Sequence, residues 1–88
     1  MVKVILNGAN GAMGKVVADL ISADPDMEVV VGVDSRADMD AAFPIMDSIN
    51  KVNVAADVVI DFSSVEAADT LLDFIEQKKI PAVICTTG

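Results

Sequence analysis

Histidine, tryptophan and tyrosine are absent from this 88-residue chain, and Cys85 is its only cysteine. Without histidine, the chain lacks the side chain that most often serves as a general acid or base near neutral pH. A lone cysteine excludes an internal disulfide framework and fits a reduced, cytoplasmic setting, which we expect for this protein. The first apolar run, which starts at Val2, is too short for a signal peptide or a membrane span.

Positive charge is also scarce, because six Lys and Arg residues face 14 Asp and Glu residues, giving a net charge of −8. Such a surface repels nucleic-acid phosphates and anionic membranes, so we expect neither as a partner. A phosphate-bearing cofactor is still compatible, since backbone amides can cradle a phosphate without a basic domain. The acidic residues are scattered and form no set of metal ligands, so we predict no metal site.

The hydrophobic core must be built mainly from aliphatic side chains. Hydrophobic residues make up 53% of the chain, and its only aromatic rings are Phe43, Phe62 and Phe74. Continuous apolar runs predict buried parallel strands at 2–6, 27–33, 56–62 and 82–84. Two helices alternate with them, from about residue 10 or 11 to 21 and from 63 to 79. The alternation predicts an α/β fold: a parallel sheet in three layers, α/β/α, with strand order 3-2-1-4-5.

Each helix is expected to carry one apolar stripe. The stripe of the first comprises Met13, Val16, Val17, Leu20 and Ile21, and the second directs inward Val65, Ala68, Leu71, Leu72 and Ile75. A capping box, Ser63 with Glu66, predicts the start of the second helix. The middle of the chain predicts a short helical turn at 37–42, an edge strand at 44–46, and a weak helix over 48–54. Asp47 is the expected N-cap of that weak helix.

A glycine-rich stretch, Gly8-Ala9-Asn10-Gly11-Ala12-Met13-Gly14, links the first strand to the first helix. In a phosphate cradle, Gly8 allows the tight turn, Gly11 leaves room for a pyrophosphate, and Gly14 lets the helix pack close to the sheet. The helix N-terminus then faces the anion. The spacing is G-x-x-G-x-x-G instead of the commoner G-x-G-x-x-G, so the motif depends on its context.

That context includes Asp34, which lies twenty residues beyond Gly14 at the carboxyl end of the second strand. Dinucleotide-binding units place an acidic residue there to bind the adenosine ribose, and we predict this role for Asp34. Arg36 lies two residues further on. It either receives the 2′-phosphate of NADPH or is a solvated loop arginine, and both interpretations stay open.

Three motifs make the chain resemble the N-terminal domain of the dihydrodipicolinate reductase family, which serves bacterial lysine and diaminopimelate biosynthesis. They are the glycine stretch, the segment Val59-Ile60-Asp61-Phe62-Ser63, and the turn Thr86-Thr87-Gly88. The resemblance covers all 88 residues and implies a Rossmann-like domain that binds NADH or NADPH. It implies that the pyrophosphate is wrapped by Gly8, Ala9, Asn10, Gly11, Ala12 and Met13.

The resemblance further implies that Asp34 holds the adenosine ribose, that Phe62 and Ser63 line the cofactor groove, and that Cys85, Thr86 and Thr87 lie by the nicotinamide. Two positions depart from the family pattern. Ala12 stands where the family often has arginine, which favours NADH unless Arg36 compensates. Cys85 replaces the first glycine of the last turn, so the local backbone there could differ.

The resemblance implies that the substrate and acid/base residues belong to a later domain. We therefore expect residues 1–88 to be a truncated cofactor domain, inactive alone, from an enzyme that is a homo-oligomer. No catalytic residue is assigned: Asp61 is expected to brace backbone N–H groups, and Cys85 to be an incidental thiol. Self-association or domain swapping across the last strand is expected of the fragment. The alternatives are the cofactor domain of an aspartate or homoserine dehydrogenase relative, and a non-catalytic nucleotide-binding or structural module.

Overall fold

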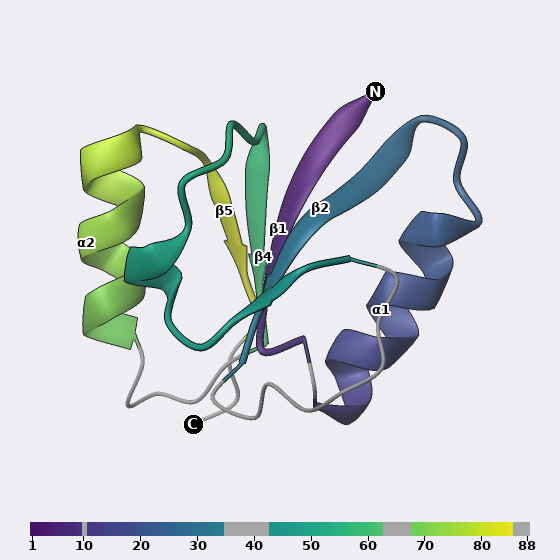
Figure 1. Ribbon diagram of the computed structural model, residues 1–88, viewed down its shortest axis with the longest axis horizontal. Coiled ribbons are helices and arrows are strands. Elements are labelled where there is room, and N and C mark those ends of the chain that lie inside the picture. The colour runs from purple at the N-terminus through teal and green to yellow at the C-terminus, as the bar shows by residue number, and fades with distance from the viewer. Residues whose placement is uncertain (10, 35–42, 63–67, 86–88) are drawn as a thin grey trace.

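A computed structural model describes residues 1–9, 11–34, 43–62 and 68–85 (Figure 1). Five strands and three helical segments follow one another along the described chain. In order they are β1 (Val2–Asn7), α1 (Ala12–Ser22), β2 (Met27–Val33), β3 (Ile45–Met46), the 3₁₀ helix η1 (Ile49–Lys51), β4 (Val58–Asp61), α2 (Ala68–Lys78) and β5 (Ala82–Ile84). The four strands predicted from apolar runs and the predicted edge strand thus form where the sequence places them.

The five strands form one parallel sheet in the order β3-β2-β1-β4-β5, which confirms the predicted topology. β1 lies at its centre, and its pairing with β2 shifts by one residue between Val4 and Ile5. Because all strands run the same way, their carboxyl ends meet at one side of the sheet. Figure 1 shows α1 beginning at that same side. We call this side the carboxyl edge; it carries Asn7, Asp34, Asp61 and Cys85.

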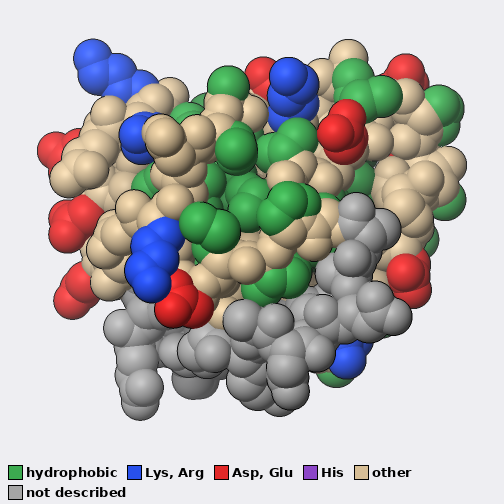
Figure 2. All heavy atoms as spheres, in the orientation of Figure 1, with side chains coloured by type: hydrophobic (Ala, Val, Ile, Leu, Met, Phe, Trp, Pro, Cys, Tyr) green, Lys and Arg blue, Asp and Glu red, His purple; other side chains and the backbone are tan. Residues whose placement is uncertain are grey.

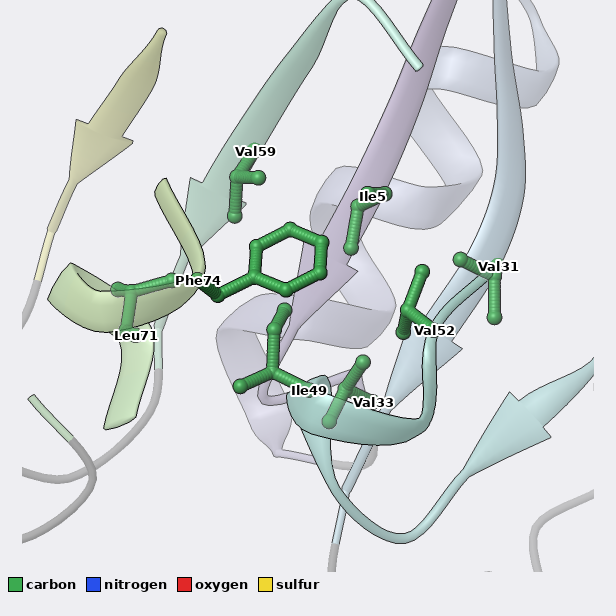
Figure 3. Close-up of a cluster of buried hydrophobic side chains, with 8 residues drawn as sticks. All are labelled: Ile5, Val31, Val33, Ile49, Val52, Val59, Leu71 and Phe74. Atoms are coloured by element: carbon green, nitrogen blue, oxygen red, sulfur yellow. The ribbon is translucent and has the colours of Figure 1, made fainter. Parts of the chain in front are cut away.

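The main hydrophobic core lies between the sheet and the layer made by η1 and α2, whereas α1 lies behind the sheet (Figure 3). The sheet contributes every second side chain to it, as strand geometry requires. The cluster comprises Ile5, Val31, Val33, Ile49, Val52, Val59, Leu71 and Phe74. Val4 and Leu6 alternate with Ile5 and are fully buried on the other face. Helical segments on both faces give the three-layer Rossmann-like fold.

The apolar stripes of the two helices are only partly buried, which corrects the sequence-based expectation. In α1, Ile21 is buried, but Met13, Val16 and Leu20 are 56%, 51% and 66% exposed. The buried line of α1 instead includes Gly14, because that residue lies against the preceding loop.

In α2, Leu72 is also exposed, and Phe74 packs inward beside Leu71. A one-residue step rotates a helix by about 100°, so Leu71 and Leu72 cannot share one narrow core face. The helical positions 71, 74 and 75 form the inward row, with Ile75 packed against the core. Val65, the Ser63–Glu66 capping box and the turn at 37–42 lie outside the described residues.

The middle of the chain contains η1 instead of the predicted helix over 48–54. Ser48, not Asp47, is its N-cap, because the Ser48 hydroxyl oxygen accepts from the Asn50 N–H at 3.3 Å. Asp47 pairs with Lys51 at 2.8 Å, and this exposed ammonium lowers the pKa of the Asp47 carboxyl.

Charged side chains lie mostly around the margin of the face shown in Figure 2, and hydrophobic side chains gather near its centre. None of the helices in the described ranges has the length and apolar character needed to span a membrane.

Candidate functional site at the carboxyl edge

The turn out of β1 is a tight one, held by a single carbonyl of β2. Gly8 has φ 86°, a left-handed conformation that favours glycine, as the motif predicted. The backbone N–H groups of Gly8 and Ala9 both donate to the Val33 carbonyl oxygen, at 2.7 and 3.1 Å. This anchors the loop directly over the end of β2, one residue before Asp34.

Gly11 is the N-cap of α1 and has an extended backbone. Among the described residues, a Cβ added there would meet the Gly8 carbonyl oxygen at 3.5 Å, an ordinary van der Waals contact. Gly11 offers no capping side chain, so the first-turn N–H groups of α1 keep their capacity to bind an anion. No described residue prevents a pyrophosphate from approaching the backbone at Gly11.

Gly14 has much less room for a side chain than Gly11 has among the described residues. A Cβ at Gly14 would lie 2.3 Å from the Gly8 carbonyl oxygen and 2.9 Å from that of Ala9. The sequence predicts close packing of the helix against the sheet at Gly14, whereas the close contacts at this position are with the loop that follows β1. Helix α1 can begin directly beneath the turn only because position 14 has no side chain.

A second close approach, which the sequence-based reasoning missed, supports the loop from β2. A Cβ at Gly32 would lie 2.6 Å from the Phe43 ring, 2.7 Å from Ile45 and 2.9 Å from the Ala9 side chain. Ala9 is fully buried and its N–H is bonded to Val33, so its contribution to the site is to hold the shape of the turn. A glycine within an otherwise valine-rich strand is the signal that could have revealed this contact.

Asp34 follows β2 and is half-buried, and its backbone N–H donates to the Met46 carbonyl oxygen at 3.0 Å. On the other side of β1, the Phe62 N–H donates to the Asn7 carbonyl and the Cys85 N–H to that of Asp61, both at 2.8 Å. These bonds extend the sheet by one residue and bring Phe62, half-buried, and Cys85, an exposed free thiol, to the same edge.

Asn7 and Asp61 are the buried polar residues among the described part of the chain, at 4% and 1% exposure. The Asn7 side-chain nitrogen Nδ2 donates to Asp61 Oδ1 at 3.1 Å. The sequence suggested that Asp61 braces backbone groups, and the structure adds a side-chain partner that was not anticipated. Asn7 could have been noticed as the one polar residue that ends a run of apolar ones.

The structure thus brings most of the predicted residues to the carboxyl edge. Gly8, Ala9, Gly11, Ala12 and Met13 form the loop and the first turn of α1, with Ala12 and Met13 exposed. Asp34 lies on one side of this loop, and Phe62 and Cys85 on the other. The remaining predicted positions fall outside the described residues; they are Asn10, Arg36, Ser63, Thr86 and Thr87.

A parallel sheet of order 3-2-1-4-5, with a glycine turn leading from its central strand into a helix, defines the Rossmann-like class of nucleotide-binding folds. Among known families, the one described as "Dihydrodipicolinate reductase, N-terminus" matches residues 2–88. The chain belongs to this family.

Named relatives agree with that assignment. The 4-hydroxy-tetrahydrodipicolinate reductases of Caldanaerobacter subterraneus subsp. tengcongensis and Clostridium novyi are 47% and 40% identical over 88 residues. The alignments cover all of this chain and 35% of each relative, so the chain spans about a third of their length. A dipicolinate-bound dihydrodipicolinate reductase from Paenisporosarcina sp. TG-14 shares the fold, with a TM-score of 0.87 and 22% identity over 100% of this chain and 38% of its own.

Proposed function

We propose that this chain is the N-terminal dinucleotide-binding domain of a dihydrodipicolinate reductase of lysine and diaminopimelate biosynthesis, acting in the cytoplasm. The observation that carries the proposal is the anchored glycine turn. Its Gly11 N-cap, which has no side chain, and the α1 N-terminus lie between Asp34 on one side and Phe62 and Cys85 on the other. A pyrophosphate over the turn leaves the two halves of a dinucleotide to occupy these two sides.

In this arrangement, the glycine turn from Gly8 to Met13 wraps the pyrophosphate. The N–H groups of Gly8, Ala9 and Gly11 hold the turn itself, so those of Ala12 and Met13 at the start of α1 face the anion. Asp34 accepts hydrogen bonds from the adenosine ribose, and Phe62, Cys85, Thr86 and Thr87 adjoin the nicotinamide. When bound, the nicotinamide supplies a hydride to a cyclic imine-type dicarboxylate in the full-length enzyme.

Both NADH and NADPH are candidate cofactors. Ala12 offers no cation to a 2′-phosphate, which favours NADH, whereas Arg36 is the residue through which NADPH would be accepted. The Arg36→Ala variant separates the two cases. A role in phosphate binding predicts weaker NADPH binding with NADH binding retained, and a solvated arginine predicts no change in either.

The substrate and acid/base residues are proposed to lie in the part of the relatives' length that this chain does not span. The 88 residues alone therefore bind cofactor without turning it over. Oxidation of NADH in the presence of the dihydrodipicolinate precursor, followed as a loss of absorbance, would contradict this.

The test of cofactor binding is a calorimetric titration of the chain with NADH, NADPH and AMP. We expect saturable binding of at least one dinucleotide, weakened in an Asp34→Ala variant through loss of the ribose hydrogen bonds. A matched control is Asp24→Ala, which removes an acidic side chain from the opposite end of β2, where Asp24 accepts from the Asp26 N–H. Absence of binding to every ligand at millimolar concentration would favour a structural module instead.

A further inference from the structure

The buried Asn7–Asp61 pair occupies positions where the strand pattern calls for apolar residues. Asn7 lies two residues after Ile5, and Asp61 two after Val59, so both continue the row of side chains that forms the main core. Burying a carboxylate is costly, and apolar residues of similar volume often stabilise a fold as well or better. Stability alone therefore does not explain a carboxylate and an amide here.

The pair also lies at the junction of the two sides of the candidate site. Asn7 and Asp61 are register partners in the parallel pairing of β1 and β4. Asn7 immediately precedes the glycine turn, whereas Asp61 immediately precedes Phe62 and its carbonyl holds the Cys85 N–H. The side-chain bond of 3.1 Å thus joins the strand that leads into the pyrophosphate turn to the strand that presents Phe62 and Cys85.

We propose that Asp61 is a positioning residue that, through Asn7, fixes the nicotinamide side of the site relative to the pyrophosphate turn. Neither side chain is exposed enough to serve as a main contact for the cofactor. Their bond instead sets where Phe62 and Cys85 stand. This inference rests on the proposed cofactor function, and it predicts that breaking the bond impairs the nicotinamide half of the ligand selectively.

The experiment compares NADH with ADP-ribose, which lacks the nicotinamide. Asn7→Leu removes the donor and keeps the branched shape of the side chain, and Asp61→Leu removes the acceptor. We expect each to weaken NADH binding about tenfold, the order of magnitude of one lost hydrogen bond, while ADP-ribose binding changes less than about threefold. Asp61→Asn keeps an acceptor oxygen and is expected to restore the wild-type ratio of the two affinities.

A matched control exists at the other end of the same two strands. The exposed Asp57 carboxylate accepts from the Lys3 N–H at 2.8 Å and so also connects β4's start to β1. Asp57→Leu removes this acceptor, as Asp61→Leu removes the other, and it is expected to leave the ratio unchanged, which separates position at the site from general bracing of the strand pair. Circular dichroism identifies the variants that fold. If Asp61→Leu does not fold, the comparison of NADH with ADP-ribose rests on Asn7→Leu.

Failure of the positioning role and failure of the cofactor function give different results in this experiment. Equal loss of both ligands in the variants, an unchanged ratio, or an Asp61→Asn variant as impaired as Asp61→Leu would overturn the positioning role while leaving the cofactor function intact. A wild-type chain that binds neither NADH nor ADP-ribose would overturn the proposed function, and this inference with it.

Discussion

Replacing Gly14 by alanine should destabilise the protein even though alanine is the better helix former. A Gly-to-Ala change inside a helix is worth about 1 kcal/mol in favour of alanine. Here the new Cβ would lie 2.3 Å from the Gly8 carbonyl oxygen and 2.9 Å from that of Ala9. Both obstacles are backbone atoms, so a side-chain rotation cannot relieve the contact.

The magnitude follows from how firmly that backbone is held. Overpacking typically costs about 1–3 kcal/mol, and we take the upper end because Gly8 and Ala9 are tied to Val33 by two hydrogen bonds. Subtracting the gain in helix propensity leaves a net loss of about 2 kcal/mol in the free energy of unfolding. For a domain of this size, that lowers Tm by roughly 8–16 °C.

Gly11→Ala is the matched variant, three residues earlier in the same motif. Its Cβ would meet the Gly8 carbonyl oxygen at an ordinary 3.5 Å, so the expected cost is that of an alanine N-cap, about 1 kcal/mol or less. NADH binding should nevertheless weaken, because that Cβ fills the space proposed for the pyrophosphate. Thermal unfolding followed by circular dichroism, with calorimetry for binding, measures both effects. A Gly14→Ala protein as stable as wild type would refute the packing argument.

Two further predictions concern the last third of the chain. Lys79 has φ 55° and donates its N–H to the Ile75 carbonyl as α2 ends. Lys79→Gly should therefore raise the free energy of unfolding by about 1 kcal/mol, whereas Lys78→Gly, within the helix, should lower it by a similar amount. Urea titration of the two variants measures both changes. β5 is an edge strand of the described sheet with Val83 52% exposed, and we expect concentration-dependent self-association that Val83→Lys reduces; a monomeric wild-type sedimentation profile at high concentration would contradict this.

The strands were predictable because a parallel strand covered on both faces must be apolar throughout. The run Val29-Val30-Val31 is typical of a buried strand, and β2 has the bounds that the sequence predicts. Strand order followed from the alternation of strands and helices. The positions of Gly8 and Asp34 at the carboxyl edge were predictable as well, because each residue closely follows the end of an apolar run.

Helix faces were less predictable, because periodicity says which residues share a side and not how much of that side is covered. Leu20 belongs to a regular apolar row and is still 66% exposed, while Gly14 is buried. For contacts between distant segments, the sequence can signal one participant but not its partner. Gly32 in a valine-rich strand indicates a close approach without identifying Phe43, and the polar Asn7 after an apolar run does not identify Asp61, 54 residues away.

The double hydrogen bond to the Val33 carbonyl has a consequence for how this site tolerates change. Because only main-chain atoms take part, no side-chain replacement at position 33 deletes the contact, and at positions 8 and 9 only proline removes a donor. The spacing between Asp34 and the glycine turn is therefore set before any ligand arrives. A ligand that spans both loses little conformational entropy in ordering them, and replacements around this point keep the geometry as long as positions 8 and 32 stay glycine.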